Sequence, residues 1–294
     1  MISNLRSAGK ASVEDSGLEK GGASVAGRIT MTAVIIAAWT GIFYVYYFLF
    51  EKASFSGGVP ELIISGLICS MSALGVLSYL VLKKFQRRKA AIMLLLCLGA
   101  DIGINWGIRS LEIAGSNSLL HCYAGINLTL LGIALFGGIL LGSIIKKPSY
   151  LIPLAAAAGL ADIWSVVFGV THEIAQSRAA MNFLLFSFPV AGKGILPIIG
   201  VMDFVFAAMF LYLSSRFNIP VIRTRFIVAA SFIISITVAV FGGFSVPVLP
   251  VMGVLFVIGQ YKYIKIVDPK EKRDAIYGIL IIAVALAVVT LIKD

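Results

Sequence analysis

The stretch YLIPLAAAAGLADIWSVVFGVT, residues 150–171, contains 22 residues, of which only Asp162 is charged. At a rise of 1.5 Å per residue, about 20 apolar residues form a helix that crosses the ~30 Å hydrocarbon core of a bilayer. The sequence therefore predicts an all-α protein, a polytopic transmembrane bundle of about nine helices. The other eight apolar runs are 29–50, 62–82, 90–108, 120–145, 195–215, 226–244, 246–264 and 275–292.

The composition agrees with this fold class. Hydrophobic residues make up 60% of the 294 residues and charged residues 13%, and the mean hydropathy is +1.01. A soluble domain contains roughly 45–50% and 25% of these residues. A soluble fold of this size cannot hide so much apolar surface, because many of its residues must face water. An ordinary soluble enzyme, a disordered protein and a disulfide scaffold are therefore excluded.

The apolar runs divide the chain into four parts. Residues 1–28 are polar and rich in small residues, and we expect them to form a disordered cytoplasmic tail. Residues 29–145 are expected to form an N-terminal membrane region of four helices, and residues 150–264 a second region of four helices. Residues 275–292 are expected to add one C-terminal transmembrane helix.

Lysine and arginine are distributed unevenly between the two sides of this bundle. With a cytoplasmic N-terminus, 19 of the 24 Lys and Arg residues fall on the inner side and 5 on the outer side. Cytoplasmic loops of membrane proteins carry such an excess. We therefore expect an integral protein of the cell membrane with its N-terminus in the cytoplasm and its C-terminus outside. The net charge of +10 follows from this topology and requires no nucleic acid as a partner.

We expect neither a metal ion nor a cofactor. Cys69, Cys97 and Cys122 lie in or beside apolar runs and lack the spacing of a metal site or a disulfide framework. His172-Glu173 is not followed by the second histidine of a zinc motif. The sequence indicates no particular oligomeric state.

Three acidic residues lie inside predicted spans: Asp101, Asp162 and Asp203. A charged side chain at the centre of a bilayer costs at least about 2.5–3.5 kcal/mol, so such residues are candidates for a functional site. Asp162 lies eight residues before Val170, near the outer end of its span, and Asp203 lies eight residues after Ile195. Both carboxyls are therefore expected ~12 Å below the outer helix ends, on antiparallel neighbours.

Two carboxyls at one depth indicate a specific chemistry. When they share a site they do not both ionise easily, and one proton is held between them. In an aspartyl protease, one carboxylate takes a proton from water while the protonated partner polarises the peptide carbonyl. Position alone leaves two other roles open, a hydrogen-bonded contact between helices and a proton relay.

The residues around the two carboxyls carry a family resemblance. The chain reads Gly159-Leu160-Ala161-Asp162, then Gly200-Val201-Met202-Asp203, then Pro247-Val248-Leu249-Pro250. This order resembles the presenilin and signal peptide peptidase family of intramembrane aspartyl proteases. That family has a Tyr-Asp helix, a Gly-x-Gly-Asp helix and a Pro-Ala-Leu element two helices on. Ala161, Met202 and Val248 stand where the family has Tyr, Gly and Ala.

The resemblance implies a presenilin-like fold over residues 150–264 and an aspartic endopeptidase that cleaves single-span membrane helices or signal peptides. Asp162 and Asp203 would be the catalytic residues. The expected topology matches the orientation of signal peptide peptidase, which implies substrates with their N-terminus inside. The residues that would contact the substrate are Gly200, Pro247, Val248, Leu249 and Pro250.

The connection between the two Asp spans contains the run Asn182–Phe188, which is too short to cross a bilayer and favours an extended backbone. The resemblance implies that such a segment pairs with the substrate as a strand. A protease must unwind a helical substrate, and an added strand pairs the freed backbone groups. A loop on the bilayer surface is the alternative.

Small and helix-breaking residues surround the two carboxyls. The run Ala155–Gly159 predicts close packing of the fifth span on a neighbour, which would allow the two Asp helices to approach each other. Pro197 and Gly200 are expected to loosen the sixth span before Asp203.

Other interpretations of the polar residues stay open. Asn105 and Arg109 follow Asp101 at one and two helical turns, which predicts a polar stripe satisfied in the bundle or a path for protons or water. For the whole chain, the alternatives are a proton-coupled transporter and an inactive relative that binds membrane helices. A transporter should show two similar halves, whereas the Pro and Gly breaks here cluster in the C-terminal half.

The topology can be tested by cysteine labelling. Cysteines at positions 86 and 269 should be shielded from a membrane-impermeant thiol reagent applied outside, because both positions lie in predicted cytoplasmic connections. A cysteine at position 180 should be labelled above the level of the unsubstituted protein. The reverse pattern would overturn both the orientation and the expected substrate class.

Overall fold

The computed structural model describes residues 30–49, 58–82, 85–114, 119–168, 178–242 and 246–265, with separate positions between 269 and 284. It describes only the backbone at 109–114, 166–168 and 178–180. The predicted tail 1–28, the dipeptide His172-Glu173 and most of the predicted helix 275–292 lie outside these residues.

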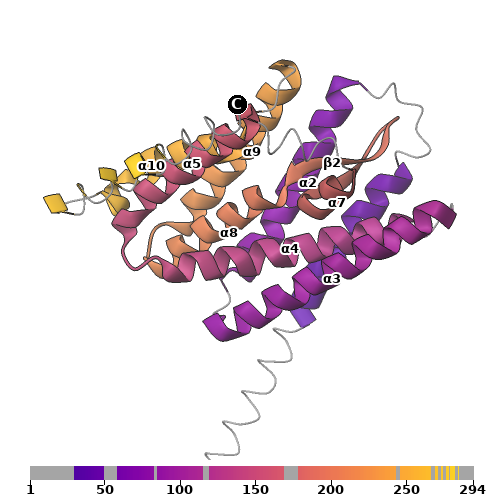
Figure 1. The fold of residues 1–294 in the computed structure, drawn as a ribbon, viewed down its shortest axis with the longest axis horizontal. Coiled ribbons are helices and arrows are strands. Elements are labelled where there is room, and N and C mark those ends of the chain that lie inside the picture. The colour runs from indigo at the N-terminus through magenta and orange to yellow at the C-terminus, as the bar shows by residue number, and fades with distance from the viewer. Residues whose placement is uncertain are drawn as a thin grey trace, which may run out of the picture.

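Helices make up most of the described chain, which confirms a helical bundle. Figure 1 shows the long helices lying side by side, with a hairpin of two strands beside α2 and α7. The chain begins with the helix Thr30–Leu49. The elements after it are α2 (Val59–Leu80), α3 (Arg87–Ala114), α4 (Leu119–Ile144), η1 (Pro148–Tyr150), α5 (Leu151–Phe168), α7 (Arg178–Leu184), β1 (Leu185–Val190), β2 (Gly194–Gly200), α8 (Val201–Arg216), α9 (Val221–Gly242) and α10 (Val248–Ile264).

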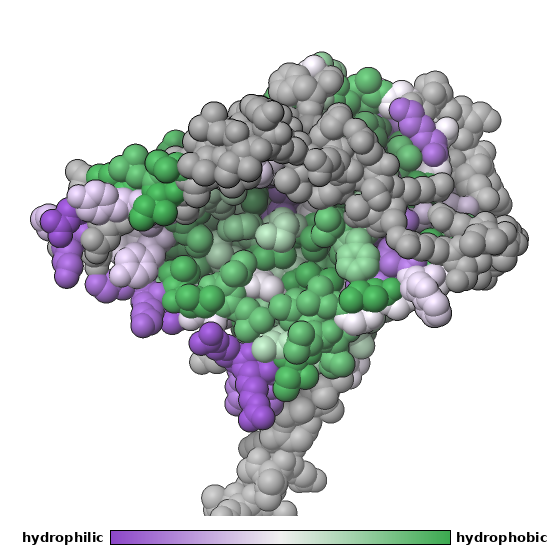
Figure 2. Space-filling view, in the orientation of Figure 1, coloured by the Kyte–Doolittle hydropathy of each residue, from purple (hydrophilic) through white to green (hydrophobic). Residues whose placement is uncertain are grey.

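Five helices of the described part are long and apolar enough to cross a membrane: Thr30–Leu49, α2, the Arg87–Ile108 part of α3, α4 and α9. Large apolar side chains such as Trp106 (76% exposed) and Phe226 (72% exposed) point outward from them. Figure 2 shows apolar residues across the middle of one face and hydrophilic residues toward its two ends. These features fit a protein embedded in a membrane.

The prediction of a helix over 195–215 is wrong in its first part. Residues Gly194–Gly200 form β2, and α8 begins only at Val201. The run Ile195–Ile199 contains three β-branched isoleucines around Pro197, which favours an extended backbone over a helix. Apolar content alone cannot distinguish a short buried strand from a helix, and this caused the error.

The two strands form an antiparallel hairpin in which Leu185 faces Gly200 and Val190 faces Gly194. The Lys193 N–H donates to the Val190 carbonyl oxygen at 3.0 Å and closes the turn. Gly194 has φ +77°, a conformation that side chains with a Cβ rarely adopt. The extended backbone expected over 182–188 is confirmed from Leu185 onward, whereas the residues before it complete α7.

Aromatic side chains bury this hairpin in the bundle. Phe186 and Phe188 on β1 are almost fully buried. The Phe186 ring lies 4.8 Å from the ring of Phe204 on α8, and the Phe188 ring lies 5.7 Å from that of Phe43 and 5.4 Å from that of Tyr46. The hairpin is therefore packed between α8 and the helix Thr30–Leu49.

Helices α4 and α8 approach each other at glycines of α4. A Cβ atom at Gly138 would lie 2.6 Å from the Val205 carbonyl oxygen and 2.8 Å from the Met209 backbone nitrogen. At the end of α8, Arg216 donates to the carbonyl oxygens of Gly142 and Ser143, at 3.0 and 3.2 Å. Small residues allow such close approach between membrane helices, so α4 and α8 form one packed unit.

We expect Gly138→Ala to destabilise the protein by about 1–3 kcal/mol, because its Cβ would meet backbone atoms that cannot turn away. Gly137→Ala is the matched control, since its Cβ would find only Val205 methyl groups at 3.7 Å. It should be neutral or stabilising, because alanine favours a helix more than glycine does. Thermal unfolding of both variants in detergent tests this. Equal midpoints would contradict the close approach of α4 and α8.

Candidate functional site

Asp162 lies on α5 and contacts the first turn of α10. The Leu249 N–H donates to Asp162 Oδ2 at 3.2 Å. Leu249 is the second residue of α10, and the capping residue Pro247 offers no side-chain hydrogen bond. The first N–H groups of a helix lack partners within it and favour a negative charge nearby. The Asp162 carboxyl therefore acts as a cap supplied by another helix.

Asp203 is the third residue of α8, and its carboxyl accepts a hydrogen bond from the backbone N–H of Gly200. Gly200 is the capping residue of α8, so this is the side-chain half of a capping box. A Cβ atom at Gly200 would lie 3.3 Å from Asp203 Oδ2. Glycine at position 200 therefore gives the carboxyl the room that it needs to turn back to the start of its helix.

The two carboxyls are near enough to influence each other. Asp203 interacts electrostatically with Asp162, although the two residues belong to α5 and α8. The first turn of α10 lies at the same place through its contact with Asp162. Of the residues expected to contact a substrate, Gly200 touches Asp203 and Leu249 touches Asp162. Val248 and Leu249 are buried beside the site.

The expected role of the small residues in α5 needs a correction. They face α10 and not the helix that carries Asp203. A Cβ at Gly159 would lie 3.3 Å from Pro250 Cα, and a Cβ at Gly253 would lie 3.2 Å from the Ala155 carbonyl oxygen. Helix α5 packs chiefly against α10. The small residues therefore bring Asp162 to the start of α10.

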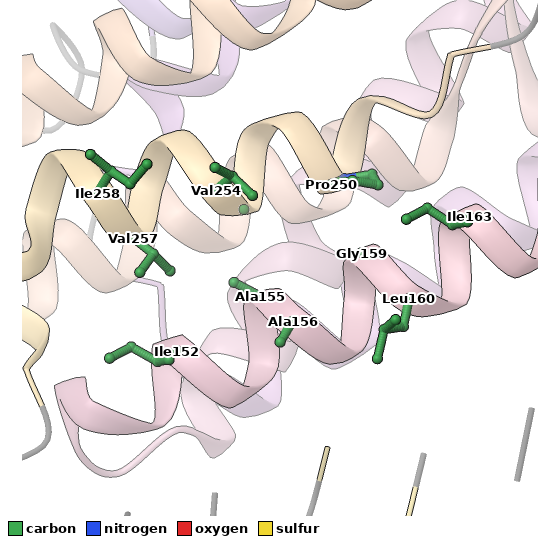
Figure 3. A pocket seen from close by; sticks show the side chains of 11 residues that line it. Ile152, Ala155, Ala156, Gly159, Leu160, Ile163, Pro250, Val254, Val257 and Ile258 are labelled. Carbon is green, nitrogen blue, oxygen red and sulfur yellow. The ribbon is translucent and has the colours of Figure 1, made fainter. Parts of the chain in front are cut away.

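An apolar groove of ≈ 440 Å³ runs between α5 and α10. Figure 3 shows it from Ile152 at one end to Ile163 and Pro250 at the other. Ile163 follows Asp162 and Pro250 follows Leu249, so one end of the groove adjoins the carboxyl site. The groove provides apolar surface next to the two carboxyls.

The three positions that depart from the family pattern lie differently around the site. Ala161 and Met202 are exposed, and the Met202 side chain is 52% exposed. Val248 is buried at the start of α10. The Met202 side chain therefore points to the outside of the bundle, although it precedes Asp203 directly.

Asp101 belongs to a second polar cluster. It is fully buried, and its carboxyl accepts hydrogen bonds from Thr129 Oγ1 on α4 at 2.9 Å and from Asn105 Nδ2 at 3.3 Å. The Thr129 bond ties α3 to α4, and the Asn105 bond lies within α3, as the interpretation of a satisfied polar stripe expects. The Arg109 side chain lies outside the described part of the chain.

Sequence reasoning missed Asn127. It lies in α4, is 2% exposed and makes two hydrogen bonds to the backbone of Ser187 in β1. The signal was present, because Asn127 is an amide between Ile126 and Leu128 in an apolar span. The rule that singles out ionisable residues inside spans does not select an amide such as Asn127.

No protein-family model, curated protein or solved structure matches this chain. Within the described residues, no group of three or more His, Cys, Asp or Glu side chains could hold a metal ion.

Proposed function

We propose that this protein is an intramembrane aspartyl protease that cleaves single-span membrane helices or signal peptides. One observation carries the proposal: Asp162 and Asp203, from two different helices, interact with each other beside the Pro247–Pro250 segment. Two interacting carboxyls can share one proton, which is what hydrolysis by this chemistry requires.

In the proposed reaction, the ionised member of the pair takes a proton from a water molecule. The water oxygen attaches to the carbonyl carbon of the peptide bond. The carbonyl oxygen accepts a hydrogen bond from the protonated carboxyl of the pair. The carbon–nitrogen bond then breaks, and the nitrogen leaves with a proton delivered by a carboxyl group. Asp162 and Asp203 exchange these protons, and neither becomes bonded to the substrate.

The hairpin supports a protease more than it supports a simple helical bundle. A peptide bond in a helix is hidden by its own hydrogen bonds, so a substrate helix must unwind before it is cut. β2 ends at Gly200, three residues before Asp203. A strand added to the hairpin would have its backbone groups paired while it passes the two carboxyls.

The catalytic pair is tested by Asp162→Asn and Asp203→Asn. Each should lower cleavage by about 10²–10⁴-fold, because an amide keeps the shape of the carboxyl but cannot exchange the proton. The measurement is cleavage of a panel of single-span helices by purified protein in lipid, with and without a transition-state mimic of the aspartyl type. Unfolding midpoints should show that both variants stay folded.

Asp101→Asn is the matched control, since Asp101 is also a buried carboxyl inside a span. It should retain most of the activity because it bonds to Thr129 and Asn105 and not to the pair. Cleavage that persists in both site variants would refute the proposal. Loss in Asp101→Asn alone would favour a proton path and hence a transporter. Helix binding by wild type without cleavage would favour an inactive relative.

The space at Gly200 gives a second test of the site. Gly200→Ala places a Cβ 3.3 Å from Asp203 Oδ2, and the carboxyl must move by a few tenths of an ångström. We expect cleavage to fall by about tenfold, since small misplacements of reacting groups are expensive. Met202→Ala, at an exposed neighbouring position, should stay within about twofold of wild type. Equal rates for both variants would argue against Asp203 as a reacting group.

A further inference from the structure

Asn127 acts on the hairpin as a neighbouring strand would. Its Nδ2 donates to the Ser187 carbonyl oxygen at 2.6 Å, and its Oδ1 accepts from the Ser187 N–H at 3.0 Å. In a sheet, an adjacent strand offers the same two groups to one residue. Both partners are at least 98% buried, so water does not compete for these bonds.

This contact closes the outer edge of β1. Residues that bond to the partner strand alternate with residues whose N–H and C=O point away from it. Ser187 turns its groups away from β2 and toward Asn127, so Pro189, two residues on, has the same orientation. Proline has no N–H to leave unpaired. Asn127 and Pro189 together leave little of this edge for another chain.

The contact also lies where the hairpin changes register. Phe186 faces Ile199 whereas Ser187 faces Pro197, so Ile198 is an extra residue in β2. The position of this bulge determines the direction in which β2 leads into α8 and Asp203. A slip of one residue in the pairing would turn the side chains of β2 to the other face of the hairpin. Asn127 fixes β1 beside this bulge.

The helix that carries Asn127 is closely packed in the bundle. Asn127 belongs to α4, which packs closely on α8 at Gly138, and α8 carries Asp203. The hairpin is thus held to the same unit that holds one of the two carboxyls.

We propose that Asn127 is a positioning residue, which holds the hairpin in register on the α4–α8 unit and thereby sets which peptide bond of a bound strand reaches Asp203. This inference rests on the proposed protease function. Asn127 acts through the backbone of Ser187. The Ser187 hydroxyl takes no part, because its Oγ has no hydrogen-bond partner among the residues that the structure describes.

The first test measures amide hydrogen exchange in the protein in lipid, without substrate. Asn127→Leu removes both bonds at similar size, and exchange at Ser187 should rise by about tenfold or more. Ser187→Ala is the matched control and should leave exchange there unchanged, because both bonds use the backbone. Equal exchange at Ser187 in wild type and Asn127→Leu would contradict the proposal that Asn127 holds β1 in place. Asn127→Ser, too short to reach both atoms, replaces Asn127→Leu if the leucine variant does not fold.

The second test measures where a substrate helix is cut, by mass spectrometry of the products. Asn127→Leu should move part of the cleavage to neighbouring bonds, whereas Ser187→Ala should keep the wild-type product ratio. Asn127→Asp should also keep it, because a neutral carboxyl has one acceptor and one donor for the same two groups. A uniform loss of rate with unchanged products would overturn the positioning role. If the wild-type protein cleaves no substrate, the proposed protease function is refuted. Hydrogen exchange at Ser187 still tests separately whether Asn127 holds the hairpin.

Discussion

Every peptide group at bilayer depth must find its partner within the protein, because the lipid offers none. A helix meets this demand except at its ends, and a hairpin leaves its outer edges unpaired. In this chain the exceptions are resolved by side chains. Asn127 pairs Ser187 of the hairpin, Asp162 accepts from Leu249 at the start of α10, and Asp203 accepts from Gly200 at the start of α8. The candidate site therefore forms where two helices begin.

This origin also explains how two carboxyls can lie near each other in an apolar bundle. Each carboxyl receives a backbone N–H from a helix start, where the peptide dipoles carry partial positive charge. The repulsion between Asp162 and Asp203 is offset in part by these donors.

The sequence predicted the helices well and their exact contacts poorly. The ends of α4 and α10 lie within two residues of the predicted spans 120–145 and 246–264, because long apolar runs have clear borders. The equal depth of Asp162 and Asp203 predicted one shared site, and the two residues interact electrostatically. The run 195–200 was taken for helix because strand and helix share its apolar content.

Two contacts could not be read from the sequence at all. The partner of the Ala155–Gly159 run depends on which helix faces it, and this is decided by the whole bundle. The pairing of Asn127 with Ser187 joins residues 60 positions apart, through a hairpin that apolar content did not reveal.

The packing of α5 has a consequence for the free energy of assembling the site. Asp162 is carried by a helix that packs chiefly against α10, whereas Asp203 is carried by one packed against α4. The two carboxyls thus belong to separate packing units. A shear of α5 with α10 along α9 would change the separation of the carboxyls while the glycine contacts within each pair stay intact. A molecule that binds between the units and favours one separation would therefore also set how strongly the two carboxyls interact.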